Sequence, residues 1–217
     1  NDYDIKFPSI GNNAIIYENG GHLFVFDLLT ERAAKLEITI AEDFYGGRNE
    51  LKDASKSVTA ASLSPDGKRV VFTARGEVFS VPAEEGITRN LTESSGAHDR
   101  EAAWSPDGKY IAYLSDRNGE FEIYLQLQDG SSEPEQLTSN ADTYKFTISW
   151  SPDSKKIALI QTSSLVVKDV ITGNVKSLTG TGYYDDPTWS PDSLKLAYMA
   201  SPRNMKADIW IKSADGS

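Results

Sequence analysis

Short apolar runs separated by turn-forming residues recur along the whole chain. In the clearest unit, residues 102–104 are apolar, residues 105–108 read Ser-Pro-Asp-Gly, and residues 110–114 (YIAYL) are apolar at every position. Proline presets φ, aspartate binds nearby backbone N–H groups and glycine accepts a positive φ, so the tetrapeptide predicts a hairpin turn. A strand that is apolar on both faces, such as 110–114, belongs between other sheets.

The same unit continues with two further predicted strands. Residues 121–127 place Phe, Ile, Leu and Leu on one face at alternate positions, while Glu122 and Gln126 mark the other face as wetter. Residues 135–138 then close the unit as an outer strand. The unit therefore consists of four short strands joined by turns.

The Ser-Pro-Asp turn repeats four times, beginning at Ser64, Ser105, Ser151 and Ser190. The intervals are 41, 46 and 39 residues. A period of roughly 40–45 residues is typical of a four-stranded β-propeller blade, whereas ankyrin and tetratricopeptide arrays repeat at about 33–34 and need helical periodicity. The repeat predicts an all-β fold, a β-propeller of four-stranded antiparallel blades.

The spacing of the turns also predicts how the chain is divided. Four blades of one propeller are expected over 57–217, at about 57–94, 95–140, 141–181 and 182–217, the last ending before its outer strand. Residues 1–40 form a further unit with strands near 14–17, 23–27 and 34–36, expected to lack its inner strand. The polar residues 41–56, which have no clear period, are predicted to be a crossover linker between two propellers.

Three complete and two incomplete blades do not make an obvious ring, because common propellers close with about four to eight. A severed ring would leave open sheet edges, which are prone to aggregation. The sequence therefore predicts an incomplete propeller that belongs to a longer chain.

Composition excludes several classes of function. The 217 residues carry 32 Asp+Glu against 22 Lys+Arg, a net charge of −10, which argues against a nucleic-acid partner. No apolar run approaches the roughly 18–20 residues that span a bilayer, so no membrane partner is expected. With no cysteine, disulfides, thiolate zinc sites and cysteine nucleophiles are excluded. No cofactor and no metal are predicted.

Catalytic chemistry also finds little support. The two histidines, His22 and His98, lie in units far apart in sequence, which argues against a histidine-based metal site. His98-Asp99 lies near Ser94 in sequence, but we interpret this stretch as a polar connection between blades rather than as a hydrolytic triad. No catalytic residue is therefore assigned. The repeated Trp104, Trp150 and Trp189 are interpreted as blade-packing residues.

Acidic residues recur where the chain enters the inner strands. In a propeller, loops at this position surround one mouth of the axial channel. Several carboxylates there would attract amino groups and basic side chains and repel anions, while the alternative is an ordinary solvated surface. The candidate channel-mouth residues are Asp99, Glu101, Asp142, Asp185 and Asp186.

These motifs resemble known repeats. Trp-Ser-Pro-Asp-Gly-Lys, an Ile-Ala-Tyr strand and a closing Leu-Thr are similar to the TolB-type, WD-like propeller repeat, which by itself says little about function. Residues 52–92 and 133–156 are more specifically similar to the tricorn protease family. The similarity runs through most of the chain, is closest over 14–156 and weakens beyond residue 159.

The tricorn resemblance implies an architecture and a role. Such proteases carry a six-bladed propeller, then a seven-bladed one, then domains with a serine peptidase site. On that scheme residues 1–40 end the first propeller and 57–217 open the second. The segment is then expected to guide and filter peptides or unfolded polypeptide segments toward a site elsewhere in a homo-oligomeric parent. None of the family's catalytic motifs matches a position here.

Other readings of the resemblance remain open. One is a TolB-like propeller that binds a protein partner, and another is the propeller cap of a prolyl-oligopeptidase-type enzyme. The tricorn resemblance implies the cytoplasm, with the periplasm left open.

Overall fold

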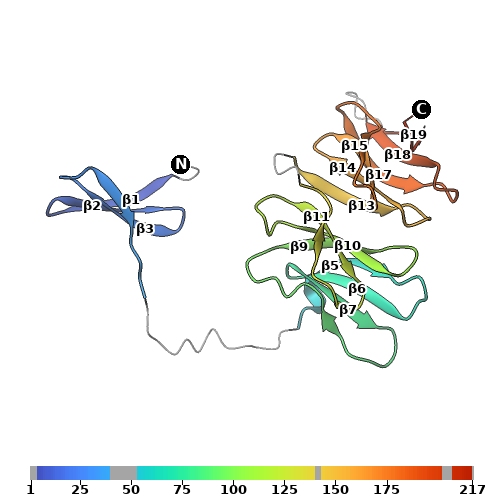
Figure 1. The fold of residues 1–217 in the computed structure, drawn as a ribbon, viewed down its shortest axis with the longest axis horizontal. Helices are drawn as coiled ribbons and strands as arrows, with labels where there is room; N and C mark the ends of the chain where they lie inside the picture. The colour runs from blue at the N-terminus through green and yellow to red at the C-terminus, as the bar shows by residue number, and fades with distance from the viewer. Residues whose placement is uncertain (1–3, 40–52, 140–142, 202–206, 217) are drawn as a thin grey trace. The chain divides into compact units, whose positions relative to one another are not determined.

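The computed structural model describes residues 4–39, 53–139, 143–201 and 207–216. Apart from one 3₁₀ turn at Ser55–Ser57, the regular elements of these residues are strands (Figure 1). The chain divides into two compact units, Asn1–Leu51 and Lys52–Ser217. The all-β fold of four-stranded antiparallel blades is confirmed.

The first unit is one antiparallel sheet whose strands follow chain order. Its strands are β1 (Ile5–Gly11), β2 (Ala14–Asn19), β3 (His22–Asp27) and β4 (Arg32–Lys35). The prediction that this unit lacks its inner strand is wrong, because β1 pairs with β2. Pro8 and a shift of register between Lys6 and Ser9 interrupt the alternation of β1, so its sequence does not read as a regular strand.

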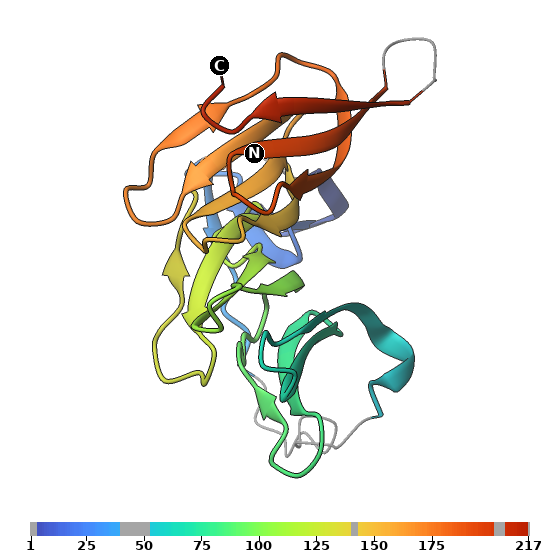
Figure 2. The ribbon, with the colours of Figure 1, turned by 90° about the vertical axis from the view of Figure 1, so that its right-hand side faces the viewer.

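In the described residues of the second unit there are three four-stranded sheets and one three-stranded sheet, all antiparallel and in chain order. Figures 1 and 2 show these sheets following one another from the cyan β5 to the red β19. The strands are β5 (Val58–Leu63), β6 (Arg69–Ala74), β7 (Glu77–Pro82), β8 (Arg89–Asn90), β9 (Asp99–Trp104), β10 (Tyr110–Ser115), β11 (Glu122–Leu127), β12 (Glu135–Gln136), β13 (Lys145–Trp150), β14 (Lys156–Gln161), β15 (Ser164–Asp169), β16 (Val175–Ser177), β17 (Tyr183–Trp189), β18 (Lys195–Ser201) and β19 (Asp208–Ser213).

The Ser-Pro-Asp turns explain why the first two strands of each sheet form hairpins. Ser105 Oγ donates to Asp107 Oδ1 at 2.6 Å and accepts from Tyr110 N at 2.9 Å. Lys109 N donates to the same Asp107 oxygen at 3.1 Å. Equivalent serine–aspartate bonds of 2.7, 2.6 and 2.5 Å form in the other three turns. Each turn is therefore closed by hydrogen bonds among its own residues.

Successive turns are also joined to one another. Asp107 N donates to Ser154 Oγ at 2.9 Å, and Asp153 N donates to Ser193 Oγ at 3.1 Å. Both bonds link the hairpin turn of one sheet to that of the next. The turns of the second, third and fourth sheets therefore help to fix the spacing between these sheets as well as the pairing within each one.

The apolar core lies between successive sheets rather than at one centre. In β10, Ile111 and Tyr113 pack toward Val71 and Val78 of the preceding sheet. Ala112 and Leu114, on the opposite face, pack toward the following sheet with Ile157 and Leu159. All four residues of β10 are fully buried, so the prediction of a strand covered on both faces is confirmed.

The tryptophans of the repeat fill these interfaces. Trp104 is buried between the first and second sheets, and Trp189 is buried between the third and fourth. Trp150 packs against the cluster between the second and third sheets. Their packing role is confirmed. Leu63, at the same repeat position in β5, is 61% exposed, so that position is not buried in every blade.

The two-sided core predicts a large difference between two leucine substitutions. Leu159→Ala, at an inter-sheet position that is 1% exposed, should lower the free energy of unfolding by about 2–5 kcal/mol, because it leaves a cavity. Leu194→Ala, in a turn and 61% exposed, should change it by less than about 0.5 kcal/mol. Urea denaturation followed by tryptophan fluorescence measures both. Equal losses in the two variants would contradict this packing.

Candidate functional site

The first strands of the sheets in the second unit approach one another. β5 contacts β9, β9 contacts β13, and β13 contacts β17. In a propeller this is the arrangement of innermost strands around the axis. Residues on these strands are therefore the ones closest to an axial channel.

Three of these inner strands contain a β-bulge at the same place. Glu101, Thr147 and Asp186 have φ of 54°, 61° and 48°, and the pairing register shifts beside each of them. Positive φ is uncommon for residues other than glycine and is a strong outlier for the β-branched Thr147. The bulges bend the strands and redirect these side chains.

The bulges correct the predicted position of the acidic residues. Asp99 begins β9, and Asp185 lies inside β17, so they are strand residues rather than loop residues. Strand pairing continues N-terminal to each apolar run because the bulge absorbs the extra residue. Asp142 lies outside the described residues.

Two of the acidic side chains bind bulge backbone. Glu101 Oε2 accepts from Thr147 N, in the bulge of the next inner strand, at 2.7 Å. Asp185 Oδ1 accepts from Asp186 N at 3.0 Å. A carboxylate bonded to a backbone N–H stabilises the strained segment. Of the predicted residues, Asp186 is exposed, and Asp185 and Glu101 are half-buried, so Asp186 is the most accessible to a ligand.

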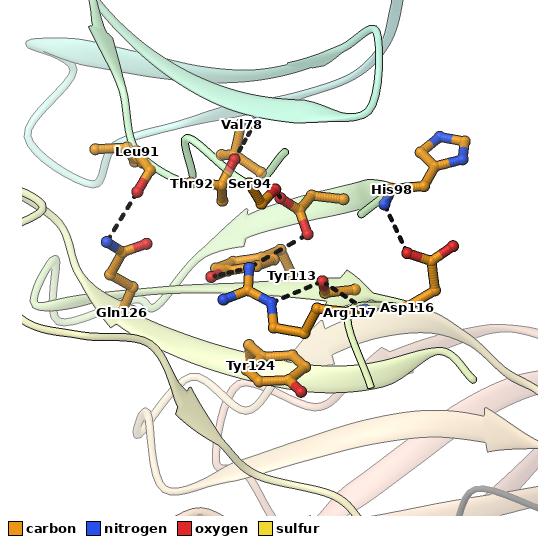
Figure 3. Close-up of polar contacts among 12 residues, drawn as sticks. Val78, Leu91, Thr92, Ser94, His98, Tyr113, Asp116, Arg117, Tyr124 and Gln126 are labelled. Carbon is orange, nitrogen blue, oxygen red and sulfur yellow. Dashed lines mark hydrogen bonds and ion pairs between the residues drawn. The ribbon is translucent and has the colours of Figure 1, made fainter. Parts of the chain in front are cut away.

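The carboxylate of Asp99 belongs to a buried polar network. Figure 3 shows this network around the labelled residues Ser94, Tyr113 and Arg117. The Asp99 side chain is fully buried, and its carboxylate accepts from Ser94 Oγ at 2.5 Å and from Arg117 Nη2 at 3.4 Å. Arg117 Nη2 also donates to the Tyr113 hydroxyl at 3.2 Å, and the guanidinium lies 4.5 Å from the centre of the Tyr124 ring. Burial raises the pKa of Tyr113 well above its ordinary value.

This network does not form a hydrolytic triad. Ser94 bonds Asp99 directly, whereas the His98 ring contacts Phe121 edge-on and has no hydrogen bond among the described residues. Only the backbone N–H of His98 is bonded, to Asp116 at 2.6 Å. A triad requires the imidazole to bridge the hydroxyl and the carboxylate, and that bridge is absent from the described part of the chain.

Beside this network lies a polar cavity of about 770 Å³ between the first and second sheets of the second unit. We call it the inter-blade groove. It is bounded by residues 88–93, which include β8, and by residues 129–134, which connect β11 to β12, with Arg117 and Gln126 between them. Arg89 crosses it, since its Nη1 donates to Asp129 O at 3.1 Å.

Sequence reasoning assigned no role to Arg117 or Gln126. The alternating pattern of residues 121–127 indicates only that Gln126 lies on the wetter face of a strand, and Arg117 belongs to no motif in the sequence. The available signal in the sequence is a polar residue within an otherwise apolar strand. In the structure this residue, Gln126, is buried, with 5% of its surface exposed. The sequence of this strand does not show which neighbouring sheet Gln126 faces, because that depends on how the sheets stack.

Within 4–39, 53–139, 143–201 and 207–216, no group of three or more His, Asp or Glu side chains is arranged to hold a metal ion. The same residues contain no helix long and apolar enough to span a membrane.

Comparison with known protein families shows which family this chain belongs to. Residues 58–217 match the family described as "Tricorn protease second beta propeller domain". The chain belongs to this family. The assignment of residues 1–40 to a preceding propeller stays a prediction.

Individual relatives extend the comparison. An uncharacterised protein of Agrobacterium fabrum, Atu1656, is 31% identical over 63% of this chain and 52% of its own length. A putative tricorn protease homolog of Streptomyces coelicolor is 23% identical over 58% of this chain and 11% of its own. The chain thus spans about half or less of these relatives.

A solved structure agrees with the propeller fold. TolB from Acinetobacter baumannii matches 99% of this chain and 53% of its own, with 26% identity and a TM-score of 0.62. The tricorn propeller family and TolB thus share these stacked four-stranded sheets.

The buried network predicts unequal effects for two basic residues. Arg117→Ala should lower the free energy of unfolding by about 2–4 kcal/mol, because it leaves the fully buried Asp99 without its cation. Lys109→Ala removes an ion pair to Asp107 in which the lysine is 70% exposed, and should cost less than about 1 kcal/mol. Urea denaturation of the two variants measures the difference, and a loss no larger for Arg117→Ala would contradict the network.

Proposed function

We propose that this chain is the non-catalytic propeller region of a tricorn-like serine peptidase, and that it guides and filters peptides toward a proteolytic site elsewhere in the polypeptide. The observation that carries this proposal is the match of residues 58–217 to the second propeller of tricorn proteases. The absence of a serine–histidine–aspartate bridge among the described residues supports a role other than catalysis.

Charge supports the filtering part of the proposal. The chain carries a net charge of −10, and Asp185 and Asp186 present accessible carboxylates on the inner strand β17. Such a surface attracts peptides rich in lysine or arginine and repels acidic ones. Asp99 contributes less, because its carboxylate is fully buried and paired with Arg117, whereas Glu101 is half-buried like Asp185.

The electrostatic filter predicts a change in substrate preference. In the full-length protein, neutralising both accessible carboxylates (D185N/D186N) should lower kcat/KM for a lysine-rich peptide about 2–10-fold at low salt, because attraction at the channel mouth is lost. The loss should shrink at about 0.5 M salt, where charges are screened. The matched control, E84Q/E85Q, removes the same charge from the exposed β7–β8 connection.

Two results would contradict the filter. One is an unchanged preference between lysine-rich and glutamate-rich peptides in D185N/D186N. The other is an equal loss in the E84Q/E85Q control, which would show that total charge acts rather than charge near the axis.

A TolB-like binding module is the second candidate, favoured by the 26% identity with TolB over 99% of this chain. This function requires no peptidase activity anywhere in the full-length protein. A full-length protein that hydrolyses no peptide but forms a stable complex with a folded partner would favour it over the peptidase.

A further inference from the structure

The three inner strands with a bulge also carry an exposed aromatic ring at the same place. The third residue before each bulge residue of positive φ is aromatic, and these residues are His98, Tyr144 and Tyr183. We call them the rim aromatics. His98 is exposed, and Tyr144 and Tyr183 are 50% and 64% exposed. None of the three belongs to an inter-sheet cluster, so packing of the core does not account for them.

Two of the rim aromatics are joined by a stack of side chains between the second and third sheets. The His98 ring meets the Phe121 ring edge-on, with 6.1 Å between their centres, and Figure 3 shows it pointing away from the buried network. The Arg100 guanidinium lies 3.8 Å from the centre of the Phe121 ring and 5.4 Å from that of Tyr144. Arg100 Nη2 also donates to the Tyr144 hydroxyl at 3.0 Å. These contacts hold the Tyr144 ring in place while half of its surface stays open.

The third rim aromatic lies at the same end of the sheets. Tyr144 O accepts from Thr162 N at 2.7 Å, and Ser163 O accepts from Gly182 N at 2.8 Å. The turn that joins β14 to β15 therefore lies between the segments that carry Tyr144 and Tyr183. The Tyr183 side chain has no hydrogen bond and no ring contact among the described residues, so its open ring serves no contact there.

We propose that the rim aromatics bind aromatic side chains of an extended polypeptide segment and give the channel mouth a preference for such segments. This inference rests on the proposed function and names its substrate class. Open tyrosine rings form offset or edge-to-face pairs with the rings of phenylalanine, tyrosine or tryptophan. Because Arg100 already holds Tyr144, little ordering cost remains on the side of the protein.

The charges beside the rings decide between a polypeptide and a nucleic acid, whose bases also stack on aromatic side chains. Within four residues of the rim aromatics, Asp99 and Lys145 are buried and already paired. The other charged residues described there are Arg100, Glu101, Asp185 and Asp186. The two turns that adjoin His98, apart from the paired Arg117, add Arg75, Glu77, Asp116 and Glu120. Negative charges predominate, which opposes a phosphate backbone and favours a segment with lysine or arginine beside its aromatic residues.

The rim aromatics and the electrostatic filter can fail separately. Attraction by carboxylates is screened at about 0.5 M salt, whereas contact between rings persists. Binding by the rings also requires no peptidase activity.

Fluorescence anisotropy of the full-length protein at about 0.5 M salt tests the rings with two fluorescein-labelled, end-capped octapeptides. One contains lysine, serine and two phenylalanines, and the other has alanine in place of each phenylalanine. The phenylalanine peptide should bind the unaltered protein about tenfold more tightly. Y144A/Y183A should reduce this ratio to about twofold or less, because both open tyrosine rings are lost.

Tyr110→Ala is the matched control. Tyr110 is 37% exposed and begins β10 beside the Ser-Pro-Asp turn, at the other end of the sheet, so the ratio should stay unchanged. Two single variants cover the case in which Y144A/Y183A does not fold. Tyr183→Ala removes a ring without side-chain contacts and should lower the ratio about 2–4-fold, whereas Tyr144→Phe keeps its ring and should keep the ratio.

Three results would overturn the inference: equal binding of the two peptides by the unaltered protein, an unchanged ratio in Tyr183→Ala, or an equal loss in Tyr110→Ala. A full-length protein that hydrolyses no peptide but keeps the ratio would contradict the peptidase assignment and still support the rim aromatics.

Discussion

Every sheet of the second unit depends on being covered on its apolar faces. A strand such as β10, with Ile111 to Leu114 fully buried, directs apolar side chains to both sides and is stable only between two neighbours. The same constraint produces three inter-sheet clusters instead of one core. The repeat of about 40 residues is the consequence, because each blade must present the same two surfaces as the one before it.

Buried charges make the stacking specific. Lys145 Nζ donates to Glu122 Oε1 at 2.9 Å across the interface between the second and third sheets, with both side chains almost fully buried. A pair of this kind contributes little net stability but penalises any stacking in which one partner is left alone. Asp99 and the partly exposed Arg117 form a further ion pair within the second sheet, and this pair places Arg117 at the wall of the inter-blade groove.

The sequence predicted the repeated architecture well because its signals are local. The serine and aspartate of each Ser-Pro-Asp turn close the hairpin within six residues, and the strands that follow alternate or remain apolar throughout. Strand β1 escaped prediction because a proline and a register shift interrupt its pattern. The bulges at Glu101 and Thr147 escaped it as well, because residues other than glycine hold positive φ there only through tertiary contacts.

The candidate site was less predictable, for a related reason. Asp99 and Asp186 look alike in sequence, yet one is fully buried against Arg117 and the other is exposed. Asp99 finds its partners within its own blade, because Ser94 lies in the connection before β9 and Arg117 in the turn between β10 and β11. Gln126 gains its position in the groove from Leu91, which lies 35 residues earlier in the chain.

The measurement that tests the central claim most directly is the native mass and peptidase activity of the species that carries these sheets in its source cells, isolated with an antibody to the second unit. The account predicts a mass several times the 23.8 kDa of this chain, together with hydrolysis of peptides by the same species. A native mass near 23.8 kDa, or a larger species that hydrolyses no peptide, would contradict it.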